Sequence, residues 1–135
     1  MADALAVSAR WEGGYAVGVE ARGHEFPVDE PPEAGGEDGG MMPTEVFLAS
    51  LASCFCLALA WKAGRDGTEL PGLRVDGRAE RAGRELRYGR IVLTATADVP
   101  GEELAPLVEH ARRLCWVSNT LAKPPAVEYR TMEVP

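Results

Sequence analysis

The chain has 135 residues, of which 46% are apolar, and its formal net charge is -7. This length suits one domain with a real core and is too short for two of ordinary size, so we expect a single domain over residues 1–135. The acidic balance argues against nucleic acid as a partner, because affinity for phosphates depends on Lys and Arg side chains that displace counterions.

Cysteine usage and the first residues bear on the cellular compartment. Three cysteines without paired spacing are too few for a secreted disulfide framework, and the start MADALAVSAR has neither the basic nor the apolar region of a signal peptide. The uncharged run from Val46 to Ala60 is shorter than the roughly eighteen residues of a membrane span. We therefore expect a cytoplasmic protein without membrane association.

The N-terminal part is expected to form an antiparallel sheet. Within residues 4–30, strand-forming residues lie on either side of Gly13-Gly14, which predicts a hairpin, and Phe26-Pro27-Val28 predicts a further short strand. The following run DEPPEAGGEDGG consists almost entirely of turn formers and acids, so it is expected to be an exposed loop.

A long helix is expected after this loop. Pro43 suits the first turn of a helix, where Thr44 and Glu45 add a polar and an acidic group beside the free N–H groups. The helix is predicted to run to about Ala63, with Gly64 as its stop. Its middle is rich in small apolar residues, which predicts a central, buried helix.

The rest of the chain predicts a second hairpin, a second helix and a last strand. Residues 73–80 and 86–98 are two β-prone segments around the polar turn RAGR. Residues 126–134 could supply a C-terminal strand. The fold class is therefore α+β. Apolar residues at helical spacing predict an amphipathic second helix that carries Cys115 on its apolar stripe, with a start made uncertain by Pro106: Leu104, Leu107, Val108, Ala111, Leu114 and Cys115.

The cysteines are the candidate chemical groups. Reduction of a peroxide by thiols requires an ionised attacking thiolate, a donor that stabilises it, and a second thiol that captures the sulfenic acid. Cys54 lies too far into its helix for the helix N-terminus to lower its pKa, so an arginine from elsewhere would be needed. Cys54 and Cys56 diverge by roughly 200° around the helix, so one of them is expected to be a packing residue; periodicity alone does not choose which.

Two cysteine-containing segments resemble a known family. The run PTEVFLASLASCFCLAL and the later run ARRLCWVSNTL are similar, in order and spacing, to the two cysteine motifs of the OsmC/Ohr family of organic hydroperoxide reductases. The resemblance implies an OsmC-like α+β fold in an intertwined homodimer. It also implies reduction of organic hydroperoxides, with Cys54 attacking and Cys115 resolving through a disulfide, no metal or flavin cofactor, and a dithiol such as dihydrolipoamide as reductant.

The resemblance also implies an activating acid and arginine. The family's peroxidases have Pro-Glu before the helix, whereas here Thr44 follows Pro43 and the acid is Glu45, as in a Pro-x-Glu branch. Along a continuous helix Glu45 lies about 13 Å from Cys54, so it either acts by another route or only complements the helix dipole. For the arginine we favour Arg22 over Arg10.

Alternatives to the peroxidase remain open. A protein of the same fold could bind a small hydrophobic or thiol-containing ligand, or act as a redox sensor. The presence of Thr44 where the family's peroxidases have glutamate is the feature that leaves this alternative open. A purely structural dimer is the weakest alternative. His24 and His110 lack metal-ligand spacing, so we expect no metal site, and His24 is expected at an exposed strand end. Trp61 and Trp116 are expected in the core or lining an apolar pocket.

Overall fold

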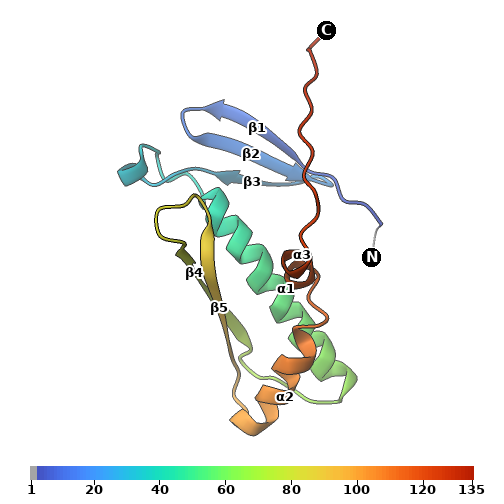
Figure 1. Cartoon of the computed structure of the whole chain (residues 1–135). Helices are drawn as coiled ribbons and strands as arrows, with labels where there is room; N and C mark the ends of the chain where they lie inside the picture. Colours follow the sequence, from blue (N-terminus) through green and yellow to red (C-terminus); the bar gives the residue numbers. More distant parts are fainter. Residues whose placement is uncertain (1–2) are drawn as a thin grey trace. The chain divides into compact units, whose positions relative to one another are not determined.

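The computed structural model describes residues 3–135 and divides into two units, Met1–Ala49 and Ser50–Pro135. The helix α1, Pro43–Arg65, begins in the first unit and ends in the second. The expected α+β class is confirmed, with antiparallel strands and helices in one chain (Figure 1). The expectation of a single domain stays a prediction.

The first unit holds the expected antiparallel sheet. Its strands are β1 (Ser8–Gly13), β2 (Ala16–Ala21) and β3 (His24–Val28), in the order β1-β2-β3. Two-residue turns join them, and both turns use left-handed backbone: Gly13 and Gly14 have φ of 107° and 55°, and Arg22 and Gly23 have φ of 55° and 85°. Such turns match the twist of the strands, which is why Gly is favoured in them.

A buried carboxylate organises the loop after β3, which includes the short 3-10 helix Pro32–Ala34. The Asp29 side chain is 5% exposed and accepts hydrogen bonds from the N–H groups of Glu30 (2.7 Å) and Gly39 (3.1 Å). The Asp29 N–H donates to the carbonyl of Met41 at 3.2 Å. The expected loop is therefore present, but its first acid is internal, because it supplies acceptors that the turning backbone needs.

Helix α1 starts as expected and ends slightly later. The Oε1 of Glu45 accepts the N–H of Met42 at 2.9 Å, which satisfies a free donor at the helix start. Gly64 stays helical, so the predicted stop is wrong by two residues. The helix ends at Arg65, and Thr68 donates its N–H to the carbonyl of Ala63 at 2.8 Å, beyond the left-handed Gly67.

The second unit packs one face of α1 against a hairpin and another helix. Strands β4 (Arg74–Arg81) and β5 (Tyr88–Thr96) pair antiparallel, which confirms the second hairpin, and α2 spans Gly101–Ala111. Val75, Ile91 and Leu93 pack from the hairpin against the core. The buried residues of this core are Leu51, Phe55, Ala58, Leu59, Ala63, Leu107, Ala111 and Cys115.

Three sequence-based expectations for the second unit are corrected. The second helix does not carry Cys115: α2 ends at Ala111, and Cys115 precedes a short helix α3, Trp116–Ala122. No C-terminal strand forms among residues 124–135, because this extended segment has no ladder partner in the described part of the chain. Helix α1 is buried on one face only, and Leu57 and Trp61 are 72% and 56% exposed.

Helix α1 as a whole is longer than its uncharged run, residues 46–60, and its length must be compared again with that of a membrane span. With 23 residues and a mean hydropathy of 1.8 over its most apolar window, it is long and apolar enough, by length and composition only, to cross a membrane. Core helices of soluble proteins pass the same test. The packing of Leu51, Phe55 and Leu59 in the core of the second unit agrees with the core-helix interpretation.

We predict that Asp29→Asn lowers the melting temperature at neutral pH, because the amide has one acceptor in place of a charged carboxylate that accepts several N–H groups. These N–H groups, that of Glu30 first, lower the pKa of Asp29 below its ordinary value. A depressed folded-state pKa stabilises the fold at neutral pH, and this contribution is lost as the pH falls from about 4 through the folded pKa. Thermal melts of wild type and Asp29→Asn at neutral and acid pH will measure the difference in melting temperature.

The matched control is Asp38→Asn in the same loop. Asp38 is exposed and has a φ of 56°, a conformation that Asn adopts as readily as Asp. A gap between wild type and Asp29→Asn that stays constant with pH, or an equal loss in Asp38→Asn, would contradict the prediction.

Candidate functional site

The structure brings together two of the three cysteines. Cys54, on α1, and Cys115, before α3, are both unbonded cysteines of the second unit, and Cys54 packs against the core cluster that contains Cys115. Cys115 is 0% exposed, whereas Cys54 is half-buried and packs against the same core cluster. The two cysteines therefore differ in exposure, with Cys54 the more accessible of the pair.

Burial is the main influence on the pKa of the Cys115 thiol. Removal from water raises the pKa of the Cys115 thiol, and the neighbouring Cys54 raises it further. The backbone N–H groups of Ser118 and Val117 act in the opposite direction, although neither makes a full capping hydrogen bond to the sulfur. The net effect raises the pKa, so at neutral pH Cys115 is held as a neutral thiol.

Cys115 is positioned by the break between two helices. Its backbone is extended, with φ of -87° and ψ of 108°, and its carbonyl accepts the N–H of Asn119 at 2.9 Å, the first bond of α3. The side-chain Nδ2 of Asn119 reaches back to the carbonyl of Arg113 at 3.1 Å. Asn119 thus ties the segment before Cys115 to the helix after it.

Cys56 lies on a different side of helix α1 from Cys54. It is half-buried, and it is absent from the core cluster against which Cys54 packs. The expected divergence of the two side chains agrees with this arrangement. Of the two, Cys54 is the cysteine of α1 that packs against the described core.

The other predicted site residues lie in the first unit. Glu45 is engaged at the helix start through Met42, which is the helix-terminus role considered from the sequence. Arg22 occupies a left-handed position in the exposed turn between β2 and β3, and Arg10 lies on β1. His24 is exposed at the start of β3, as expected. Activation of Cys54 by Arg22 or Glu45 stays a prediction.

Two tryptophans are more exposed than expected. Trp61 is 56% exposed, and the guanidinium of Arg65 lies 5.2 Å from its ring centroid. Trp116 is 62% exposed and lines a shallow hollow of about 490 Å³ with Asn119 and Lys123. Neither ring is in the core of the second unit. Among residues 3–135, no group of three or more His, Cys, Asp or Glu side chains is arranged to hold a metal ion.

Comparison with known proteins gives a consistent result. A family model described as OsmC-like protein matches residues 35–130. A curated relative, an uncharacterized protein of Methanocaldococcus jannaschii, is 29% identical over 86 residues, or 59% of this chain; the match spans 44% of that relative, less than half of its length.

Solved structures resemble the chain over most of its length. An OsmC-like protein of Mycoplasma pneumoniae has a TM-score of 0.79 at 15% identity, with 92% of this chain and 91% of that chain covered. An organic hydroperoxide resistance protein of Elizabethkingia anophelis has a TM-score of 0.68 at 25% identity, with the same coverage of 92% and 91%. The first of these likenesses concerns the fold alone.

We predict that a general thiol oxidant such as diamide joins Cys54 to Cys115, and that Asn119→Ala slows this closure between about two- and tenfold. The lost hydrogen bond to Arg113 is worth about 0.5–1.5 kcal/mol of positioning. The rate is measured by loss of free thiols, and the disulfide is identified by peptide mass. Thr120→Ala is the control, because the Thr120 hydroxyl bonds only within α3, to the carbonyl of Trp116 at 2.8 Å. Equal rates in Asn119→Ala and wild type would refute the positioning role.

Proposed function

Because the chain belongs to the OsmC-like protein family, we propose that it is a cysteine-based reductase of organic hydroperoxides, with Cys54 as the attacking thiol and Cys115 as the resolving one. The packing of Cys54 against the core cluster that contains the buried Cys115 carries this proposal. The organic hydroperoxide resistance protein among the similar structures supports the substrate class. Family and fold alone would not assign the roles of the two cysteines.

The exposure of the two sulfurs supports the order of attack. The Cys54 thiolate attacks one oxygen of the O–O bond, the bond breaks, and the leaving alkoxide takes a proton to give an alcohol. Cys54 is left as a sulfenic acid. Cys115 is fully buried and has a raised pKa, so it is poorly suited to meet a peroxide first.

The second step uses the position of Cys115 in the core cluster against which Cys54 packs. The Cys115 sulfur attacks the sulfur of the sulfenic acid, the S–O bond breaks, and water leaves after protonation of the hydroxyl. The product is a Cys54–Cys115 disulfide. Cys115 must lose its proton for this attack, and the backbone N–H groups of Ser118 and Val117 favour the Cys115 thiolate. A dithiol such as dihydrolipoamide would then reduce the disulfide by thiol exchange, without a bound cofactor.

The activating groups and the assembly belong to the same proposal. Arg22 and Glu45 are proposed to favour the Cys54 thiolate, with Arg10 as the alternative cation. We further propose a cytoplasmic homodimer. Its support in the second unit is the exposed apolar surface that includes Leu57 and Trp61, since a soluble protein seldom leaves large apolar side chains together in water.

One observation favours a second candidate function. Glu45 already accepts the N–H of Met42, so one of its carboxylate oxygens is engaged at the helix start. If Glu45 does not assist Cys54, the same cysteine pair would suit a redox sensor or a binder of small thiol-containing ligands, which oxidises slowly and does not turn over efficiently.

The first test is to add one equivalent of cumene hydroperoxide to the reduced protein and count free thiols. We expect the count to fall from three to one. Cys54→Ser should keep both remaining thiols, Cys115→Ser should yield a trappable sulfenic acid, and Cys56→Ser should lose two thiols as wild type does. An unchanged count in wild type would refute the enzyme, and slow loss without repeated turnover in dithiol would favour the sensor.

The second test addresses activation of Cys54. We expect Arg22→Gln to slow oxidation of Cys54 by about 10- to 100-fold at neutral pH, because a nearby cation favours a thiolate. Glu45→Gln should slow it less, because a carboxylate assists a thiolate only by holding the guanidinium in place. Stopped-flow oxidation across a pH series is the measurement, and a rate restored at high pH identifies a pKa effect. An unaltered pH profile in Arg22→Gln would exclude it and leave Arg10→Gln as the next variant.

A further inference from the structure

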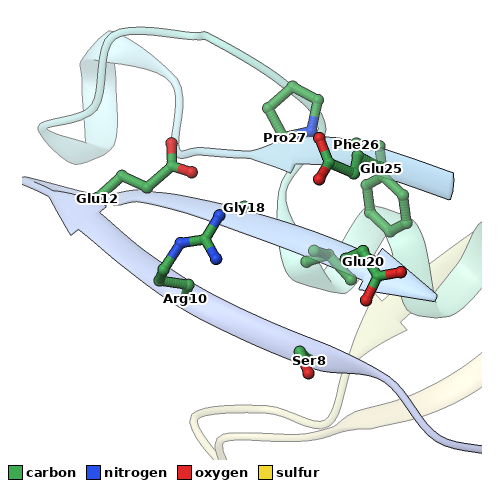
Figure 2. Close-up of a pocket in the computed structure, with 9 residues that line it drawn as sticks. Ser8, Arg10, Glu12, Gly18, Glu20, Glu25, Phe26 and Pro27 are labelled. Carbon is green, nitrogen blue, oxygen red and sulfur yellow. The ribbon is translucent and has the colours of Figure 1, made fainter. Parts of the chain in front are cut away.

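A hollow on the sheet of the first unit carries charged groups that the proposed reaction does not use together. It has a volume of about 660 Å³ and lies on one face of β1, β2 and β3 (Figure 2). Arg10, Glu12, Glu20 and Glu25 line it, with the backbone of Gly18 below. Its volume falls in the range of small-molecule sites, which runs from about 300 to 1,000 Å³.

The strand register explains the shape of the hollow. Arg10 pairs with Gly18, and Gly18 pairs with Pro27, so the central row across the sheet has one long side chain. Gly18 has no side chain, and a Cβ there would collide with the carboxylate of Glu12, which extends over it. The missing side chain at Gly18 lets the Glu12 carboxylate lie over the strand, and the Arg10 side chain lies beside Gly18 (Figure 2).

The charges alternate along the strands. The row next to Arg10 carries Glu20 opposite Glu25, and Glu12 lies beyond Arg10 on the other side. Residues two apart on one strand face are about 7 Å from each other. The hollow therefore presents a cation between carboxylates, with a formal charge of -2 over these four groups.

These charged groups have unused hydrogen-bonding capacity. Among residues 3–135, the side chain of Arg10 makes no ion pair or hydrogen bond, and the side chains of Glu12 and Glu25 likewise have none. Only Glu20 is engaged, since it accepts the N–H of Gly23. A guanidinium has five donors in a planar fork that matches a carboxylate, and no other residue in the described part of the chain engages those of Arg10.

We propose that this hollow binds a free α-amino acid, with the ligand's carboxylate on Arg10 and its ammonium group facing Glu12 and the Glu20–Glu25 row. A ligand with only a carboxylate would pair with Arg10 but would be repelled by the three acidic side chains. A ligand with only an ammonium group would pair with the acidic side chains but would be repelled by Arg10. A zwitterion complements both signs at once. The Glu12 carboxylate, which lies over Gly18, is placed to meet the ligand's ammonium group.

The test is a titration of the 15N-labelled full chain with glycine, acetate and methylammonium, followed by amide chemical shifts. We expect glycine to shift the amides of β1, β2 and β3 around Arg10 and Gly18 with a millimolar Kd, and acetate and methylammonium to bind at least about tenfold more weakly. Arg10→Gln and Glu12→Gln should each weaken glycine about tenfold or more. Gly18→Val, which would displace the Glu12 carboxylate, should abolish the shifts.

Matched controls separate this site from the cysteine pair. Arg22→Gln alters an exposed arginine of the same sheet outside the hollow and should leave glycine binding unchanged, as should Cys54→Ser. The proposal is overturned by equal binding of acetate and glycine, by unaltered glycine binding in Arg10→Gln, or by an absence of shifts up to about 50 mM glycine. None of these outcomes bears on peroxide reduction, which the thiol count tests independently.

Discussion

The burial of Cys115 in the core of the second unit, against the helix that carries Cys54, is the constraint on which the candidate chemistry depends. A sulfur enclosed by Leu59, Leu107 and other apolar groups is protected from solution oxidants and kept neutral. Cys54, which is half-buried, packs against the same cluster. The core therefore does two things with the same contacts: it stabilises the fold and makes two chemically identical side chains unequal.

The sequence predicted the parts of the fold whose signals are local. Both hairpins follow from β-prone runs around Gly-containing turns, and the start of α1 follows from Pro43 with Glu45 behind it. These features depend on turn geometry and free N–H groups, which neighbouring residues determine. The two cysteine motifs also predicted the family, which the family model over residues 35–130 confirms.

What the sequence did not reveal depends on contacts between distant residues. Apolar spacing runs from Leu104 through Cys115 without interruption, yet the helix stops at Ala111, because Asn119 and the turn before it rearrange the backbone. Asp29 looked like one more loop acid, and only the return of the chain at Gly39 gives it donors. The exposed Trp61 and Trp116 show that apolar periodicity identifies a helix face but not what covers it.

Cys115 lies at a non-helical junction between α2 and α3, and this position affects how the redox state of the cysteine pair could be observed. Closing a disulfide requires small shifts of the backbone that carries the sulfur, and a non-helical junction accommodates them more easily than a helix interior would. Trp116 is the next residue along the chain, and its ring is largely open to solvent. Indole emission responds to small changes in its surroundings, so the chain contains its own optical reporter beside the buried thiol and needs no added label.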